Sequence, residues 1–287
     1  MEREAKNYIS RRQFGEASVT VIDEASGLWP LELVGPDGEP IVNVPGTDAK
    51  GRALIGFHVV HIQTHDASIL VDSGLDDPDT AWGREFEANW RSVRRTPGLK
   101  AGLAHIGVTP SDITHVLITH AHFDHIAGLT VERDGVQVPR FANATVFLGR
   151  GDWENNPERD TPGSEAAVRL GCIERHGLLH LVDADETIAP EVTMIPSPGE
   201  SPGHCIVRVS SQGETFYALG DLFHHTAEVE HLDWVAPWVD RPSMLRSREK
   251  LLVEAKQTSA TLAYTHHVFP PWGSVAETDG AWQWQES

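Results

Sequence analysis

In the N-terminal quarter of the chain, hydrophobic residues either alternate with polar ones or form short runs rich in β-branched side chains. The segments 17–23, 53–64 and 67–74 have this character, and it is typical of β-strands. The polar stretch "THD" at 64–66 separates the last two segments and predicts a hairpin. This part of the chain is therefore expected to build a sheet.

Farther along, segments with a helical spacing of apolar residues alternate with further strand-like runs. Helices are predicted at 81–95, 99–107, 164–177 and 243–258, the last opened by Ser243. Strands are predicted at 113–119, 144–149, 180–185, 191–197 and 260–266, with a hairpin over 205–221. No polar linker, repeat or low-complexity run separates these elements, so one mixed α/β domain over residues 1–287 is expected.

Residues 29–51 interrupt the pattern, because glycines and prolines stand between short apolar runs. This composition predicts a long loop or arm. Its apolar residues are expected to pack on another surface, and a homodimer is predicted from this arm.

The charge balance narrows the range of partners. The chain of 287 residues is 40% hydrophobic, enough for a sizeable core, and carries a formal net charge of -19. Nucleic acid and anionic membrane surfaces both require a basic footprint, so neither is an expected partner. No stretch approaches the ~18 continuous apolar residues of a membrane span.

Cysteine content and the N-terminus bear on the compartment. Cys172 and Cys205 are the only cysteines, and neither lies in a CxxC or zinc-finger spacing. The stretch "SRRQF" at 10–14 resembles a twin-arginine export signal, but the alternating and acidic segment after it lacks an apolar core. We therefore expect a cytoplasmic protein.

The segment "THAHFDHIAG" at 119–128 concentrates titratable side chains directly after a buried strand. His120 and His122 are two residues apart and point the same way in extended backbone, while Asp124 and His125 follow on the turn. Neutral imidazole nitrogens and carboxylate oxygens are the ligands of borderline divalent cations. The spacing predicts a site for two metal ions side by side.

This segment resembles the HxHxDH signature of the metallo-β-lactamase-fold hydrolases. Three later segments match the family's order: "SPGESPGHC" with His204, "FYALGDLF" with Asp221 and "AYTHHVFPPWG" with His266. The resemblance extends from about residue 17 to 275. It implies a four-layer αββα sandwich, two face-to-face sheets with helices outside.

The resemblance also implies ligand roles. One ion would be held by His120, His122 and His204, the other by Asp124, His125 and His266, with Asp221 bridging both. Zinc is the expected metal, with iron, manganese or cobalt as alternatives. Asp72, in "ILVDSG", would orient the ligand histidines. His267 competes with His266 for the last position, and His266 is preferred because its distance to Gly273 fits the family pattern.

Two positions depart from the family pattern. Cys205 replaces the usual Thr or Ser after the third histidine, and Glu200 stands where many relatives have another histidine. Alternation along a strand turns Cys205 away from His204, so a small buried residue is expected there.

Two divalent ions roughly 3.5 Å apart can share a hydroxide and polarise a carbonyl or phosphoryl oxygen. The resemblance assigns the proton shuttle to Asp124. No GxSxG elbow, P-loop or GxGxxG segment offers another chemistry. The predicted reaction is therefore hydrolysis by a bridging hydroxide.

The substrate prediction rests on resemblance within the superfamily. The stretches "GDLFHH…DW", "RSREKLL" and "TH…FPPWG" are most similar to the branch of N-acyl-homoserine lactonases and methyl-parathion-type organophosphate hydrolases. A lactone or related ester is the expected substrate, with organophosphate triesters or aryl esters as the alternative. A mononuclear-iron sulfur dioxygenase is the alternative from another class.

Aromatic residues near the ligand segments are candidates for an apolar substrate pocket. Trp29 opens the arm, and the other candidates lie beside Asp221 or His266 in the sequence. The alternative is that such tryptophans belong to the core or to a dimer interface. The candidate substrate-binding residues are Phe223, His224, Trp234, Trp238 and Trp272.

Overall fold

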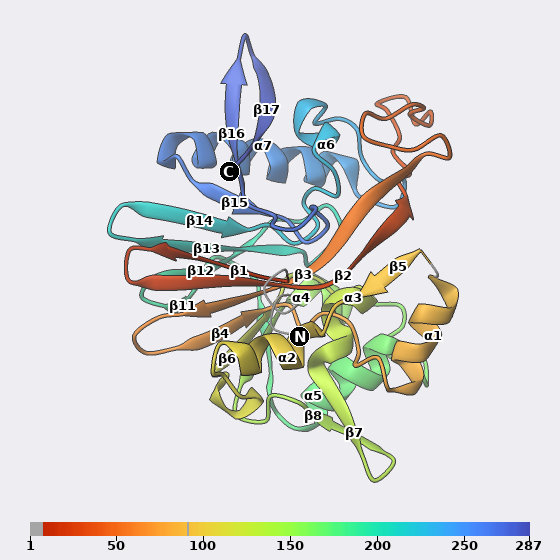
Figure 1. Ribbon diagram of the computed structural model, residues 1–287, viewed down its shortest axis with the longest axis vertical. Helices are drawn as coiled ribbons and strands as arrows, with labels where there is room; N and C mark the ends of the chain where they lie inside the picture. The colour runs from red at the N-terminus through yellow and green to blue at the C-terminus, as the bar shows by residue number, and fades with distance from the viewer. Residues whose placement is uncertain (1–7, 91) are drawn as a thin grey trace.

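Two β-sheets lie face to face at the centre of the computed structural model, which describes residues 8–90 and 92–287 (Figure 1). The first sheet has the order β1-β2-β3-β4-β6-β9-β10, with β5 beside β2. Its strands are β1 (Ile9–Phe14), β2 (Ala17–Pro30), β3 (Arg52–Gln63), β4 (Ser68–Val71), β5 (Val93–Arg95), β6 (His115–Ile118), β9 (Thr145–Gly149) and β10 (Leu179–Val182).

The second sheet runs β11-β12-β13-β14-β15-β16-β17 in the order of the chain. Neighbouring strands are antiparallel except β14 and β15, which are parallel. The strands are β11 (Glu186–Ala189), β12 (Val192–Pro196), β13 (Cys205–Ser211), β14 (Glu214–Ala218), β15 (Thr261–Ala263), β16 (Gly273–Thr278) and β17 (Ala281–Glu286). A separate hairpin joins β7 (Thr130–Arg133) to β8 (Val136–Pro139).

Helices cover the outer faces of both sheets (Figure 1). On the side of the first sheet lie α1 (Ala81–Asn89), α2 (Gly98–His105), α3 (Phe123–Ile126), α4 (Arg150–Glu154) and α5 (Gly171–Arg175). The short helices η1 (Pro110–Asp112), η2 (Ala127–Leu129) and the π-helical η3 (Ala166–Leu170) complete the helical segments between β5 and β10. On the side of the second sheet lie α6 (Ala227–Glu230) and α7 (Arg241–Thr258).

Three apolar layers hold this arrangement together. Between the sheets, Val19 and Leu117 of the first pack with Val207 and Phe216 of the second. A second layer joins the outer face of the first sheet to α2 and α5, and a third joins the outer face of the second sheet to α7. Because each sheet is buried on both faces, the expected four-layer αββα sandwich is confirmed.

The strand pairing brings the ends of several strands to one edge. Strands β4, β6 and β9 are parallel, with Val71 opposite Leu117 and Leu117 opposite Phe147, so their carboxyl ends coincide. Strands β14 and β15 are also parallel and end together. The segments after these strands therefore meet, as is usual for parallel strands with a ligand site at their carboxyl ends.

Several boundaries differ from the expected ones. The helix predicted over 81–95 ends at Asn89, because residues 93–95 pair with β2 as strand β5. Helix α7 begins at Arg241 rather than Ser243, since the side chain of Asp240 caps it by accepting the backbone N–H of Ser243. The hairpin of β16 and β17 was not predicted; it is joined by six residue pairs, and Val275, Trp282 and Trp284 pack against the apolar layer between the second sheet and α7.

The segment 29–51 is largely an irregular arm, as expected, although β2 continues through Trp29 and Pro30. Val34 forms isolated bridges with Pro40 and Val235, and Leu33 packs with Ala227. The arm therefore covers the region around α6 in the same chain. The homodimer stays a prediction.

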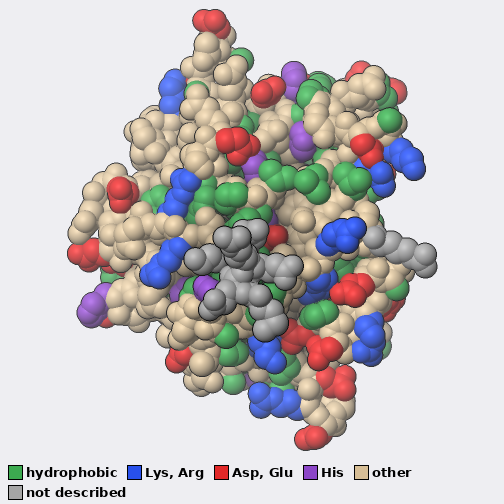
Figure 2. Space-filling model, viewed as in Figure 1, with side chains coloured by type: hydrophobic (Ala, Val, Ile, Leu, Met, Phe, Trp, Pro, Cys, Tyr) green, Lys and Arg blue, Asp and Glu red, His purple; other side chains and the backbone are tan. Residues whose placement is uncertain are grey.

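The stretch "SRRQF" lies within β1, paired antiparallel with β2. None of the helices in residues 8–90 and 92–287 combines the length and the apolar character needed to cross a membrane. Figure 2 shows one face, on which Lys and Arg side chains lie singly or in small groups among acidic and neutral ones.

Candidate metal centre

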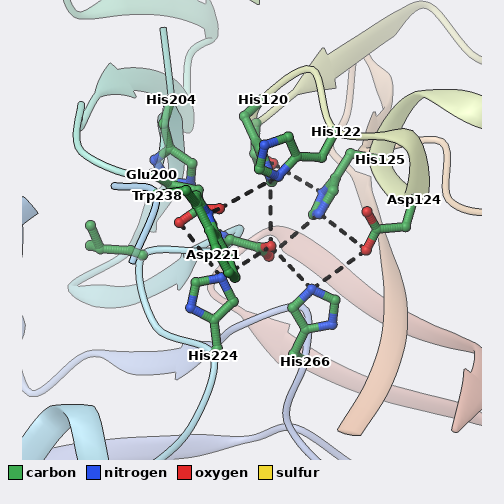
Figure 3. Close-up of polar contacts among 12 residues, drawn as sticks. His120, His122, Asp124, His125, Glu200, His204, Asp221, His224, Trp238 and His266 are labelled. Carbon is green, nitrogen blue, oxygen red and sulfur yellow. Dashed lines mark hydrogen bonds and ion pairs between the residues drawn. The ribbon is translucent and has the colours of Figure 1, made fainter. Parts of the chain in front are cut away.

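Seven of the sequence-predicted side chains lie at the shared edge of the two sheets (Figure 3). The turn after β6 carries His120 and His122, and the first turn of α3 carries Asp124 and His125. Asp221 and His266 follow the parallel strands β14 and β15, and His204 directly precedes β13. The candidate residues thus come from segments that the strand order brings together.

A first group of potential ligand atoms contains His120, His122, Glu200 and Asp221, whose atoms all lie within 4.8 Å of one another. The Nε2 atom of His120 is 2.9 Å from Nδ1 of His122 and 3.7 Å from Oδ2 of Asp221. Two imidazoles and two carboxylates offer the mixed nitrogen and oxygen donors that divalent transition metals prefer.

A second group contains Asp124, His125 and His266. The Nε2 atom of His266 lies 3.0 Å from Oδ2 of Asp221 and 3.5 Å from Oδ2 of Asp124. The Nε2 atom of His125 lies 3.4 Å from the other oxygen of Asp221. Figure 3 shows the carboxylate of Asp221 between the two groups, so one side chain faces both.

Outer hydrogen bonds set the orientation of two of these rings. Oδ2 of Asp72 lies 2.8 Å from Nδ1 of His125, and Nδ1 of His266 lies 3.0 Å from the backbone oxygen of Gly56. With Nδ1 donating in each ring, the Nε2 lone pair is directed into the centre. Asp72 also accepts the backbone N–H of Thr119 at 2.7 Å, which joins the ends of β4 and β6.

Mutual electrostatics shift the proton affinities of the buried groups. Burial lowers the pKa of His120 well below its ordinary value, and the neighbouring His125 lowers it further. Burial alone would raise the pKa of Asp221, but His266 and His125 outweigh it and hold this pKa well below the usual range. The neutral His120 beside the ionised Asp221 matches the protonation pattern that metal binding requires. Burial alone would lower the pKa of His125 and of His266, but Asp221 and the other nearby carboxylates outweigh it and raise both, so a cation binding there would displace protons.

The residues of the centre also fit a cation because two of their buried polar atoms have no hydrogen-bond partner. Within the described part of the chain, Nε2 of His125 and Oδ1 of Asp221 are buried and have no hydrogen-bond partner. An unpaired buried polar atom carries the full desolvation cost of that group. A cation between these atoms would satisfy both.

His204 lies beside the centre but in neither group. Its Nδ1 atom is 3.0 Å from the backbone oxygen of Ser197, and its Nε2 atom accepts the backbone N–H of Asp221 at 3.2 Å. Both ring nitrogens therefore have backbone partners. Of the two adjacent histidines at the end of β15, His266 faces the centre, whereas Nε2 of His267 lies 3.0 Å from Glu286.

One important side chain was missed in the sequence. Asp152, in α4, accepts the backbone N–H of Ala121 at 2.8 Å, the hydroxyl of Ser201 at 2.8 Å and the backbone N–H of Gly203 at 2.6 Å. It ties the histidine turn to the loop that carries Glu200. The available signal was an acidic residue shortly after a predicted buried strand, whereas Asp72 was found through the family resemblance of "ILVDSG".

A cavity of about 900 Å³ opens over the centre. Trp29, Phe57, Trp82, Phe123 and Trp238 line it, together with Asp124, Asp221, His224, His266 and Glu200. Among the described residues that line it there is no lysine or arginine. The cavity therefore combines an aromatic lining and the acidic and imidazole groups of the centre with polar side chains such as Glu32, Asn155 and Glu165.

Three of the predicted substrate-binding residues do not line this cavity. Trp272, directly before β16, is buried between the sheets against Phe14 and Phe216. Phe223 packs under α7, where the Arg248 guanidinium lies over its ring. Trp234 stacks on His231 beside the arm.

The remaining candidates do line the cavity. Trp238 is 57% exposed, and its indole N–H donates to Oε1 of Glu200 at 2.7 Å. His224 places Nε2 3.6 Å from both Glu200 and Asp221. Cys205 is buried in the inter-sheet core, as alternation along the strand predicted, and burial raises the pKa of its thiol.

Two face-to-face sheets with imidazoles and carboxylates at their common edge define a metal-binding protein of the αββα class. The model of the metallo-beta-lactamase superfamily matches residues 58–267, and the chain belongs to that superfamily.

Relatives by sequence include a probable metallo-hydrolase of Mycobacterium tuberculosis, 27% identical over 228 residues, covering 74% of this chain and 68% of the relative. An N-acyl homoserine lactonase of Azorhizobium caulinodans is 26% identical over 240 residues, covering 78% of this chain and 85% of the relative.

Solved structures show the same fold. A probable metal-dependent hydrolase from Staphylococcus aureus superposes with a TM-score of 0.76 at 24% identity, over 96% of this chain and 99% of the other. The dizinc quorum-quenching lactonase AidC superposes with a TM-score of 0.73 at 19% identity, over 98% of each chain.

Proposed function

We propose that this protein is a metal-dependent hydrolase that holds two divalent cations and opens a lactone, or cleaves a related neutral ester. The observation that carries the proposal is the pair of ligand groups facing one carboxylate, Asp221, at the base of an apolar cavity. The names of the lactonase relatives support the choice of substrate class.

His120, His122 and Asp221 would hold the first cation, with His204 adjacent, and Asp124, His125, His266 and Asp221 would hold the second. Two bound divalent cations would lower the pKa of a shared water to near neutrality and polarise the carbonyl oxygen of the substrate. Zinc is the proposed metal, because imidazole and carboxylate ligands suit it.

The side chains around the cations have separate tasks. Asp124 lines the cavity beside His266, at 3.5 Å between Oδ2 and Nε2, which supports a role for its carboxylate in passing a proton to the leaving alkoxide. The aromatic walls exclude water from the base of the cavity and offer surface to an acyl group.

The lining also separates substrate classes by charge. An anionic substrate such as a glutathione thioester needs basic side chains to bind its carboxylates, and the described lining residues supply none. A neutral lactone or ester with an apolar acyl chain has no carboxylate that must be desolvated without a basic partner. The cavity volume of about 900 Å³ lies at the upper end of ordinary ligand pockets, which suits a long chain.

The proposal is tested with purified protein, by measuring hydrolysis of N-acyl-homoserine lactones of increasing chain length beside a neutral aryl phosphotriester. We expect lactone opening whose KM falls as the acyl chain lengthens. Turnover of the phosphotriester alone would assign the site to organophosphate hydrolysis and contradict the proposal.

A further inference from the structure

Glu200 is the least expected member of the candidate metal centre. It is only 4% exposed, and in the described structure its Oε2 atom has no hydrogen-bond partner. Its Oε1 atom accepts the indole N–H of Trp238 at 2.7 Å. A buried carboxylate with one free oxygen is costly unless a positive group faces it.

The nearest nitrogen atoms do not complete its coordination. Nδ1 of His122 lies 3.4 Å from Oε1, and Nε2 of His224 lies 3.6 Å from Oε2. Both distances exceed a normal charge-assisted hydrogen bond of about 2.7–2.9 Å. Glu200 nevertheless lies within 4.8 Å of potential ligand atoms of His120, His122 and Asp221. A cation shared with these residues would give the buried carboxylate a positive partner.

The backbone holds Glu200 in this place. Gly199 has a φ of 150°, and a Cβ atom there would lie 2.5 Å from the Cα of Met244, so the loop can press against α7 only with glycine. On the other side, Asp152 binds Ser201 and Gly203. A carboxylate fixed from both sides is preorganised for a ligand.

Glu200 and His204 differ in whether their polar atoms already have hydrogen-bond partners within the protein. Both ring nitrogens of His204 already have backbone partners, at 3.0 and 3.2 Å, whereas Glu200 keeps one oxygen unpaired. Of these two side chains, Glu200 is the one that lies in the ligand group of the first cation.

We propose that Glu200 is a direct ligand of the cation held by His120, His122 and Asp221, and that it shifts this site toward cations that prefer oxygen. The inference rests on the two-cation site of the proposed function, but it concerns metal binding and not the substrate. Carboxylate oxygen suits Mn²⁺, whereas imidazole nitrogen suits Zn²⁺. An added carboxylate should therefore reduce the difference in affinity by which such a site prefers Zn²⁺ to Mn²⁺.

The test is the affinity of metal-free protein for Zn²⁺ and for Mn²⁺, each measured by competition with a chromogenic chelator. The variants are E200Q, E200H and, as the matched control, E249Q, which neutralises an exposed glutamate of α7 outside both ligand groups. Circular dichroism of the metal-free variants checks that each is folded.

We expect E200Q to bind Zn²⁺ and Mn²⁺ at the first site at least about tenfold more weakly, because it loses an anionic ligand and even outer partners of ligands are worth about 10–100-fold. E200H should recover Zn²⁺ binding while its Mn²⁺ affinity stays at least about tenfold below that of the wild type, because imidazole favours zinc. E249Q should bind Zn²⁺ and Mn²⁺ as the wild type does. If E200Q does not fold, the ratio of affinities in E200H carries the test.

A merely structural role for Glu200 predicts something else. Affinities for the two metals that fall in parallel in both variants, or that do not change, would overturn the inference and leave the two-cation hydrolase standing. Conversely, a protein that opens no lactone but shows the expected change in metal preference would contradict the proposed function alone.

Discussion

The Oδ2 atom of Asp72 lies 2.8 Å from the Nδ1 atom of His125, in a position where both side chains are buried. Asp72 adopts a φ of 60° directly after β4, a conformation that aspartate and asparagine tolerate better than most residues. The contact fixes the tautomer of His125, whose Nε2 atom then faces Asp221 at 3.4 Å.

Replacing Asp72 with asparagine should therefore weaken metal binding without straining the backbone. The amide of D72N can present N–H to His125, which favours the tautomer with a proton on Nε2 and removes that lone pair. We expect about 10–100-fold weaker binding of one ion, measured by metal content after dialysis against a chelator. D66N, at an exposed aspartate in the β3–β4 turn, is the control; equal metal content in both variants would contradict this role.

Asp152 should matter for stability more than an ordinary aspartate. In D152N at least one of the buried N–H groups of Ala121 and Gly203 faces an amide that cannot accept its hydrogen bond. Such an unpaired group costs about 1–3 kcal/mol. Urea unfolding of metal-free protein measures the loss, with D160N at an exposed position as the control. Coincident unfolding curves for D152N and wild type would refute the assigned role.

The aromatic wall should determine chain-length preference. Trp82 lines the cavity and lies under the Arg169 guanidinium, 5.2 Å from the ring centroid, outside both ligand groups. In W82A we expect KM for a decanoyl lactone to rise about tenfold with kcat little changed. A tenfold rise corresponds to losing the burial of roughly two methylene groups of the acyl chain. W282A, on the C-terminal hairpin, is the control. An equal rise for a butanoyl lactone would exclude a chain-binding role.

Glu24 predicts a pH dependence of folding that is independent of the metal centre. Its carboxylate is buried where it accepts the backbone N–H groups of Leu75 and Leu99, and burial raises its pKa from 4.5 to about 7. Since the folded state then binds the proton more tightly than the unfolded state, this residue's contribution to stability is present below pH 4.5 and is lost as the pH rises through about 7.

The loss is on the order of 3 kcal/mol at 1.4 kcal/mol per pKa unit. It is measured as the difference in unfolding free energy between wild type and E24Q at several pH values, with E249Q on the exposed face of α7 as the control. A difference between wild type and E24Q that does not change between pH 4.5 and 7 would show that Glu24 keeps an ordinary pKa.

The strands and the histidine turn could be predicted from local pattern, whereas the αββα arrangement of the elements came from the family resemblance. The strand periodicity and the spacing of His120, His122, Asp124 and His125 depend on residues close together in the chain, and local geometry determines which way they point. The resemblance to a known family then placed Asp221 and His266 after the strands where the structure has them.

What could not be predicted depends on contacts between distant segments. Asp152 accepts the backbone N–H of Gly203, which is 51 residues away in the sequence. The position of Glu200 depends on a loop that is held between α4 and α7. Proximity in sequence to a ligand was also a poor guide for Phe223 and Trp272, since adjacent residues at a strand or loop point to opposite sides and both rings fill the core.

The central claim is hydrolysis that depends on two cations held by this edge of the sheets. It is tested most directly by adding Zn²⁺ stepwise to metal-free protein while following the opening of an N-acyl-homoserine lactone. The account predicts a rate that rises until two ions are bound per chain and does not rise further. A full rate with one ion per chain, or no lactone opening with two ions bound, would contradict it.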